Sequence, residues 1–410
     1  MSSQKERDRR KAERAAVYGR RRFEWDLRGK ARDALSNKNI REVFRQLAYP
    51  ITFNAFTQVE QLNGAPLTDR AMRLLRCEFA DDFKMRPPID VLEEVITSIA
   101  SRHVVHPVRD YLESLEWDGV PRVDRWLIHY AGADDTPYVR AVSAKPLIAA
   151  SRRVFQPGCK FDTLLILEGS QGCGKSSAVA ALVPMPDWFS DHLPLDEDPK
   201  VVIEQTDGKW ILEAAELRGS RGESAHVKAL LSRSCDIARP AYGRYTQSFY
   251  RQWISIGTTN TRSGYLIDPT GARRFWPVPV NVFDVAGIRR DRDQLWAEAR
   301  ARDKAGESLE LPRELWPVAA REQEARYDEN EFYEDRLDPM LSGNLDGRVT
   351  LTSIGNALEI PPTQMHDQRI SKAIRTFMMR RGWRKHPTNR GIEYHRIDKD
   401  VTGDDAEVGG

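Results

Sequence analysis

The feature that most constrains the fold is a glycine-rich segment, Gly-Ser-Gln-Gly-Cys-Gly-Lys-Ser, at residues 169–176. A continuous apolar run, Thr163–Leu167, precedes it, and an apolar helical pattern, Ser176–Leu182, follows it. This order of buried strand, loop and helix fits the phosphate-binding loop GxxxxGK[ST] at every fixed position. Its backbone N–H groups wrap around phosphates, and the helix N-terminus favours an anion. The predicted nucleotide contacts are Gly169, Ser170, Gln171, Gly172, Cys173, Gly174, Lys175, Ser176 and Ser177.

Two further apolar runs, Trp210–Leu217 and Trp253–Gly257, have the length and composition of buried strands. A helical pattern at Tyr138–Phe155 precedes the first strand. Strands that alternate with helices indicate a mostly parallel sheet, and therefore an α/β fold. We expect this α/β nucleotide-binding core to occupy residues 138–338.

Two acidic residues, Glu213 and Glu216, lie in the second predicted strand. ATP hydrolysis needs Mg²⁺ and a group that orients or deprotonates water, while Lys175 reaches the phosphates and Ser176 holds the metal. We expect Glu216 to be the main catalytic acid and, with Ser176, a metal ligand. Residues three apart on a strand point to opposite faces, so Glu213 is either a second catalytic acid or a solvent-facing or capping charge.

Beyond the strand that carries the two acidic residues, three further residues are candidates for sensing or stabilising the γ-phosphate. Asn260 ends the third predicted strand, where an amide can polarise the attacking water. Arg273 and Arg274 follow it, and such a pair suits an arginine finger, which can act on a neighbouring subunit. The alternatives are an ordinary turn residue and a pair of surface arginines.

The segment between the second and third predicted strands combines basic residues with an interleaved aromatic side chain. Such a pattern can follow a phosphate backbone and stack on a base. The alternative is a solvated helix face followed by a turn. The predicted DNA contacts in this segment are Lys228, Arg239, Tyr242 and Arg244.

Residues 348–398 predict a winged helix. Leu351–Leu358 forms one helix, Asp367–Arg381 forms a second, and a hairpin follows, which together make a helix-turn-helix with a wing. Its predicted DNA contacts are Arg369, Lys372 and Arg375. The alternative is a packing or oligomerisation module, because such a fold does not fix its function.

The two ends of the chain differ in charge. Residues 1–45 form a basic arm, either for DNA or RNA or as a solvated terminal helix, and residues 399–410 form an acidic tail. Residues 46–137 read as a helical collar or docking domain, with helical spacing at Ala71–Phe79 and Asp90–Ile99. His103 and His106 are three apart, but Pro107 follows and no second ligand pair is near, which favours structural histidines over a metal site.

Composition excludes several classes of protein. The sequence has 63 Lys+Arg and 61 Asp+Glu, so any nucleic-acid surface must come from local segregation of charge. The four cysteines include no CxxC pair, which argues against a disulfide framework or a zinc ribbon. The hydrophilic N-terminus and the short apolar runs argue against a secretory signal or a membrane span. We expect a cytoplasmic protein of a bacterial host cell.

These motifs together resemble the virulence-associated protein E (VapE) family of phages and prophages, which is related to superfamily 3 helicases and to poxvirus-type primase-helicases. The resemblance covers roughly residues 44–285 and is carried by six segments in order: residues 106–122, 157–177, 210–217, 239–244, 257–260 and 268–278.

The resemblance implies an AAA+-like core in a homo-hexameric ring, with ATP-driven movement on single-stranded or forked DNA. It matches Lys175 and Ser176 to the phosphate loop, Glu216 to the acidic strand end, Asn260 to the sensor, and Arg273 or Arg274 to the finger. It also implies a replicative role. Residues 1–135 contain neither a clustered acidic triad nor a zinc-ligand set, so we expect any primase activity to come from a separate polypeptide. The expected partners are such a primase or host replication proteins. The two acids are three apart here, whereas many helicases have them adjacent.

We therefore expect a DNA-dependent ATPase that acts as a helicase or translocase. The first alternative is an ATP-switched DNA-binding initiator or regulator that does not unwind DNA. The second is a P-loop kinase, which would be a monomer whose ATPase ignores DNA.

Overall fold

The structure is a computed structural model, and it describes residues 35–195, 197–215, 221–239, 245–260, 274–326, 329–344, 346–361, 365, 368–388 and 391–397. The chain divides into two compact units. The first comprises the described part of residues 1–116 together with residues 203–208, and the second comprises the remainder. Most of the predicted basic arm and the whole acidic tail lie outside the described residues.

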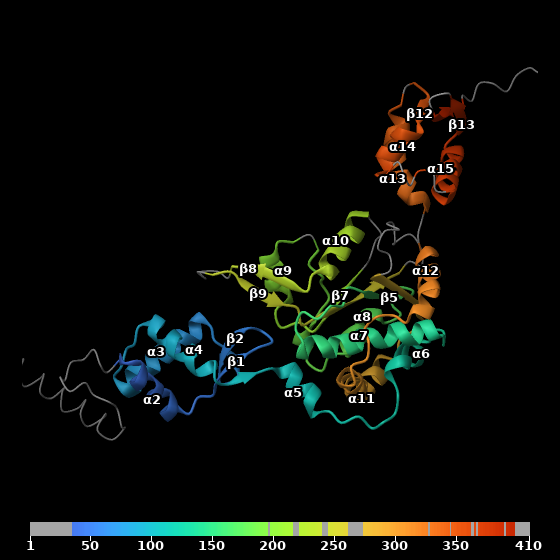
Figure 1. The fold of residues 1–410 in the computed structure, drawn as a ribbon. Coiled ribbons are helices and arrows are strands. Elements are labelled where there is room, and N and C mark those ends of the chain that lie inside the picture. Colours follow the sequence, from blue (N-terminus) through green and yellow to red (C-terminus); the bar gives the residue numbers. More distant parts are fainter. Residues whose placement is uncertain are drawn as a thin grey trace, which may run out of the picture. The chain divides into compact units, whose positions relative to one another are not determined.

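The first unit mixes helices with a small sheet (Figure 1). Helices were expected at residues 71–79 and 90–99, and α3 and α4 cover both. The four-stranded sheet, in the order β3-β2-β1-β4, was not expected, because each of its strands has only two to four residues. The elements are α2 (Asn37–Leu47), β1 (Ile51–Asn54), β2 (Val59–Leu62), β3 (Ala65–Pro66), α3 (Asp69–Phe83), α4 (Ile89–Ala100), β4 (Val104–Val105) and α5 (Pro107–Ser114).

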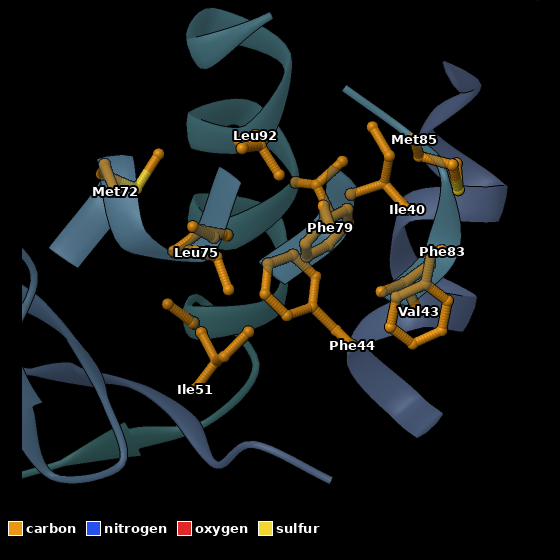
Figure 2. Packing of buried hydrophobic residues seen from close by; sticks show 13 residues of the cluster. Ile40, Val43, Phe44, Ile51, Met72, Leu75, Phe79, Phe83, Met85 and Leu92 are labelled. Atoms are coloured by element: carbon orange, nitrogen blue, oxygen red, sulfur yellow. The ribbon is translucent and has the colours of Figure 1, made fainter. Parts of the chain in front are cut away.

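A single apolar cluster holds the helices α2, α3 and α4 together (Figure 2). Phe79 of α3 is fully buried, and its ring lies 5.3 Å from the ring of Phe44 in an edge-to-face arrangement. Such aromatic pairs add to the stabilisation that comes from burying their area. His106 caps α5, because its Nδ1 accepts a hydrogen bond from the backbone N–H of Arg109 at 3.2 Å. This is a structural role for one of the two histidines.

The second unit is built on a five-stranded sheet in the order β11-β5-β10-β7-β6, in which every pairing is parallel. This sheet confirms the predicted α/β class. Its elements are η2 (Val123–Arg125), α6 (Trp126–Ala131), α7 (Pro137–Phe155), β5 (Leu164–Glu168), α8 (Lys175–Ala181), η3 (Pro186–Trp188), β6 (Phe189–Ser190), β7 (Ile211–Ala214), α10 (Arg221–Ser232), β8 (Cys235–Ala238), β9 (Gln247–Tyr250), β10 (Ile254–Thr259), β11 (Phe275–Pro279), α11 (Val285–Lys304), η5 (Arg313–Leu315) and α12 (Trp316–Glu324). Helix α9 (Pro199–Thr206) begins in this unit, and its residues from 203 onward belong to the first.

Helices flank this sheet (Figure 1). Helix α7 contacts β5 and β10, α8 contacts β7 and β10, and α11 packs on both α7 and α8. Three tryptophans join these layers. The ring of Trp210 lies 4.1 Å from that of Trp296 on α11 and 6.1 Å from that of Trp188. The indole N–H of Trp296 donates to the carbonyl of Leu182, directly after α8, at 2.6 Å.

The C-terminal part has three helices and an antiparallel sheet in the order β12-β14-β13. The two predicted helices and the hairpin are present as α14, α15, β13 and β14. One apolar cluster, which includes Ile354, Phe377 and Trp383, holds this part together. The elements are α13 (Glu329–Ser342), β12 (Arg348–Thr350), α14 (Leu351–Leu358), α15 (Gln368–Arg380), β13 (Trp383–Thr388) and β14 (Gly391–Arg396).

Among the described helices, none combines the length and the apolarity that a bilayer span requires.

Truncating Phe79 to alanine should destabilise the first unit by about 3–5 kcal/mol, because the change leaves a cavity in its core. Urea unfolding followed by circular dichroism measures this effect. Leu74→Ala on the same helix is the matched control, because Leu74 is 61% exposed and its loss should change stability by less than about 0.5 kcal/mol. Equal effects of the two changes would contradict the packing described here.

Candidate functional site

The glycine-rich loop begins where β5 ends, at the carboxyl edge of the parallel sheet (Figure 1). The N–H of Gly169 donates to the carbonyl of Thr259 at 3.2 Å, which ties the loop to the end of β10. Gly172 and Gly174 have φ angles of 81° and 91°. Residues that carry a Cβ rarely adopt this backbone conformation. Helix α8 then starts at Lys175. The loop therefore has the strand-loop-helix geometry that surrounds phosphate in such motifs.

Lys175 is the central cation of the site. Its side chain is only 7% exposed. Its Nζ donates to the carbonyls of Gly169 and Ser170 at 2.7 and 2.9 Å, and to Oδ1 of Asn260 at 2.9 Å. No carboxylate is among these contacts, so a neutral set of oxygens holds the ammonium group. A phosphate, which is anionic, can replace those oxygens and gain a charge-assisted hydrogen bond.

Ser176, which follows Lys175 in the sequence, forms a second cluster with Glu213 and Thr258. The hydroxyl of Ser176 donates to Oε1 of Glu213 at 2.6 Å, and the hydroxyl of Thr258 donates to the same oxygen at 2.6 Å. Glu213 is 1% exposed and lies in β7, which pairs with β10. The structure therefore places Glu213, the second candidate for the catalytic acid, inside the site. Glu216, which we expected to be the main catalytic acid, lies outside the described residues.

Thr258 was not singled out from the sequence. Its signal is its place in β10, two residues before Asn260, because side chains two apart on a strand lie on the same face.

The Ser176 hydroxyl and the Glu213 carboxylate are the described groups that fit a magnesium ion. Both offer oxygen, and they are already within hydrogen-bond distance of each other. Among the residues the structure describes, no cluster of three or more His, Cys, Asp or Glu side chains could hold a metal ion. One carboxylate and one hydroxyl still suit Mg²⁺, which keeps several waters and takes its remaining ligands from phosphates.

Arg274 lies at the opposite edge of the sheet. It immediately precedes β11, which pairs in parallel with β5 through Phe275 and Leu164 at their amino ends. Its Nε contacts Oδ2 of Asp162 at 3.3 Å. A strand of five residues spans about 15 Å, so Arg274 is separated from the phosphate loop of the same chain by the length of β5. Arg273 lies outside the described residues.

Arg274 also lines a cavity of about 560 Å³ at this amino edge. Trp276, Trp316 and Asp162 contribute to the same cavity.

The predicted DNA contacts have different surroundings. Lys228 of α10 is 8% exposed, and its Nζ lies 5.7 Å from the ring centre of Phe275. This burial does not suit the predicted contact with a phosphate backbone, because Lys228 packs inward on the sheet. Arg239 is exposed directly after β8, in the hairpin of β8 and β9, while Tyr242 and Arg244 lie outside the described residues.

In the C-terminal part, Lys372 and Arg375 are exposed on α15, and the side chain of Arg369 lies outside what the structure describes. Arg384 and Lys385 on β13, which sequence reasoning did not single out, are exposed as well.

Residues 112–328 match the virulence-associated protein E-like domain. The chain belongs to this family. The match confirms the resemblance seen in the sequence, and it covers the five-stranded sheet together with the phosphate loop. Membership of this VapE-like family, with its phosphate loop, implies nucleotide binding.

Solved structures similar to this VapE-like chain include two apo structures of the C-terminal region of NrS-1. One is 11% identical with a TM-score of 0.45, and the match covers 90% of this chain and 100% of that chain. The other, described as the A form, is 9% identical with a TM-score of 0.43 and covers 87% and 98%. No match was found among curated protein sequences.

Glu213→Gln should retain the fold. It should reduce the factor by which Mg²⁺ increases the affinity for ATP by about 10- to 100-fold. The amide keeps an oxygen that can accept from the hydroxyls of Ser176 and Thr258 but removes the negative charge. Calorimetric titration with ATP in Mg²⁺ and in EDTA measures the effect.

Glu298→Gln is the matched control, because Glu298 is also buried and accepts backbone hydrogen bonds from Arg122 and Val123 elsewhere in the unit. If Glu213→Gln responds to Mg²⁺ as the wild type does, Glu213 is not the metal ligand, and Glu216→Gln becomes the variant to test.

Proposed function

We propose that this VapE-like protein is an ATP-dependent DNA helicase or translocase that serves the replication of a phage or other mobile element. The observation that supports the proposal is the convergence of three strand ends on the phosphate loop. Lys175 meets Asn260, and Ser176 meets Glu213, so an amine, an amide, a hydroxyl and a carboxylate share one edge of the sheet. This set suits hydrolysis of a nucleoside triphosphate.

Each residue has a distinct role in the proposed mechanism. Lys175 binds the β- and γ-phosphates and offsets their charge. Asn260, already held by Lys175, orients the attacking water through its amide. Glu213 or Glu216 accepts the proton from that water. Mg²⁺, held by Ser176 and an acidic residue, would polarise the phosphate oxygens.

The position of Arg274 supports a ring. One subunit cannot bring this guanidinium to its own phosphate loop, because the two lie at opposite edges of the sheet. A neighbouring copy can present its amino edge to that loop, and Arg273 or Arg274 would then stabilise the transition-state charge. We therefore propose a homo-hexamer with an AAA+-like, superfamily 3 core and active sites between subunits.

The exposed basic residues support DNA as the partner. Arg239 lies at the β8–β9 hairpin, where Tyr245 is also exposed. We propose that the C-terminal part is a winged helix, with α14 and α15 as its helix pair and the β13–β14 hairpin as its wing. Lys372 and Arg375 on α15 would contact phosphates of single-stranded or forked DNA. A separate primase or host replication proteins would act with this ring.

Steady-state ATPase with and without single-stranded DNA is the first test, combined with light scattering for mass. Lys175→Ala should lower kcat by at least about 100-fold, because it removes the main cation at the phosphates. The matched control is Lys304→Ala, an exposed lysine at the end of α11, which should leave the rate unchanged.

DNA stimulation in a high-mass ring, lost in Lys175→Ala, supports the motor, and unwinding of a fork would follow. DNA binding without stimulated turnover would favour the ATP-switched initiator. A monomer whose turnover ignores DNA would contradict the helicase and favour the kinase.

If an arginine of one subunit acts on the phosphate loop of its neighbour, two inactive variants should restore activity to each other in a mixed ring. Arg274→Ala and Lys175→Ala should each be inactive alone, but a reassembled mixture should recover part of the turnover. In the mixture, an intact loop of one variant meets an intact arginine of the other. Mixing Lys175→Ala with the Lys175→Ala/Arg274→Ala double variant is the control, because no intact loop remains. An active Arg274→Ala would exclude Arg274 as the finger and leave Arg273.

A further inference from the structure

A buried ion pair lies directly before the phosphate loop. Glu168 is the last residue of β5 and is 0% exposed. Arg326, which is 7% exposed, follows α12, and its Nε and one terminal nitrogen each donate to a different oxygen of Glu168 at 2.8 Å. The other terminal nitrogen of Arg326 contacts the Glu322 carboxylate and donates to the Glu322 carbonyl at 2.9 Å. The guanidinium is therefore held on both of its sides.

Such a pair contributes little to stability, because desolvating both charges offsets most of their attraction. A pair of apolar side chains would stabilise this place equally well. The value of the bidentate pair is its geometry, since two parallel hydrogen bonds fix the carboxylate in orientation as well as in distance. A fixed carboxylate matters at this position because the backbone of Glu168 leads directly into the phosphate loop at Gly169.

Glu168 is linked to Lys175 by a short series of contacts. Its carbonyl accepts from the N–H of Val280 at 2.7 Å, and the next residue is Gly169. A Cβ on Gly169 would lie 2.9 Å from Sγ of Cys173 and 3.0 Å from the carbonyl of Val280, so Cys173 and Val280 pack closely against this start of the loop and leave no space for a side chain. The carbonyl of Gly169 in turn accepts from Nζ of Lys175. A displacement of Glu168 therefore reaches the ammonium group.

Arg326 is itself fixed to the sheet. Helix α12 contacts β11, and the side-chain amide of Gln323 donates to the carbonyl of Phe275 at 2.7 Å. Past Arg326 the chain continues to α13, whose Tyr333, Leu337 and Leu341 belong to the apolar cluster of the C-terminal part. Arg326, which donates to both carboxylate oxygens of Glu168, thus lies near the end of the nucleotide-binding core.

We propose that Arg326 is a positioning residue of the nucleotide site, which holds the start of the phosphate loop through Glu168 so that Lys175 meets the phosphates. The inference rests on the proposed nucleotide hydrolysis. It assigns a part in nucleotide affinity to Arg326, a residue near the end of the core that contacts Glu168, the residue directly before the loop.

Three variants separate positioning from simple stability. Arg326→Lys keeps the charge but loses the two-pronged contact. Arg326→Met removes the arginine that faces the buried Glu168 carboxylate, and Glu168→Met/Arg326→Met replaces both charges with apolar groups of similar size. The measurements are the melting temperature, the Kd of a fluorescent ATP analogue with Mg²⁺, and KM and kcat for ATP.

Arg326→Lys should weaken binding of the analogue and raise KM by about tenfold, because small displacements of binding groups have large effects. Arg326→Met should also lower the melting temperature. The double variant should regain the melting temperature, since neither buried charge remains, but should not regain the affinity. A purely structural pair would regain both together.

Arg152→Lys is the matched control, because Arg152 pairs with buried Asp303 at 2.8 Å between α7 and α11, away from the loop. It should leave the Kd unchanged. Wild-type affinity in Arg326→Lys, or in the double variant, overturns the inference. A wild type that neither binds nor hydrolyses ATP would instead overturn the proposed function.

Discussion

The site depends on one strand, β10, which pairs in parallel with β5 on one side and with β7 on the other. The register places Thr259 opposite Glu168, and Ile256 opposite Glu213. Because parallel strands end at the same edge, three segments far apart in sequence deliver their polar ends to one place. The contacts of Lys175 with Asn260 and of Ser176 with Glu213 both follow from this register. A slip of one residue would turn Thr258 away from Glu213.

Several charged side chains are buried at this edge of the sheet, although burial in an apolar interior disfavours charge. Glu168, Glu213 and Lys175 are all buried, and each has hydrogen-bond partners that offset the loss of water. The partners differ in kind. Glu168 is matched by a full positive charge, whereas Glu213 and Lys175 are held by neutral hydroxyl, amide and carbonyl groups. The first arrangement suits a fixed support, and the second suits groups that exchange partners when a ligand arrives.

Local patterns in the sequence were enough to predict the α/β sheet, the phosphate loop and the helices α3, α4, α7, α14 and α15. Their signals are contained within a few neighbouring residues. The place of Glu213 inside the site was different, since it depends on which face of β7 meets α8, and that is set by long-range pairing. The burial of Lys228 against Phe275 depends on the packing of α10 on the sheet. The positive charge of Lys228 predicted an exposed residue instead. The strands of the first unit were missed because two to four residues carry too little alternation.

The cluster of Trp188, Trp210 and Trp296 beside the sheet has a practical consequence. Trp296 is hydrogen-bonded at the end of α8, the helix that carries Lys175, and its ring lies against that of Trp210. Indole emission depends on ring contacts and hydrogen bonds of this kind. The protein thus contains its own optical probe, and a shift of α8 when a ligand enters would change the intrinsic fluorescence without any attached dye.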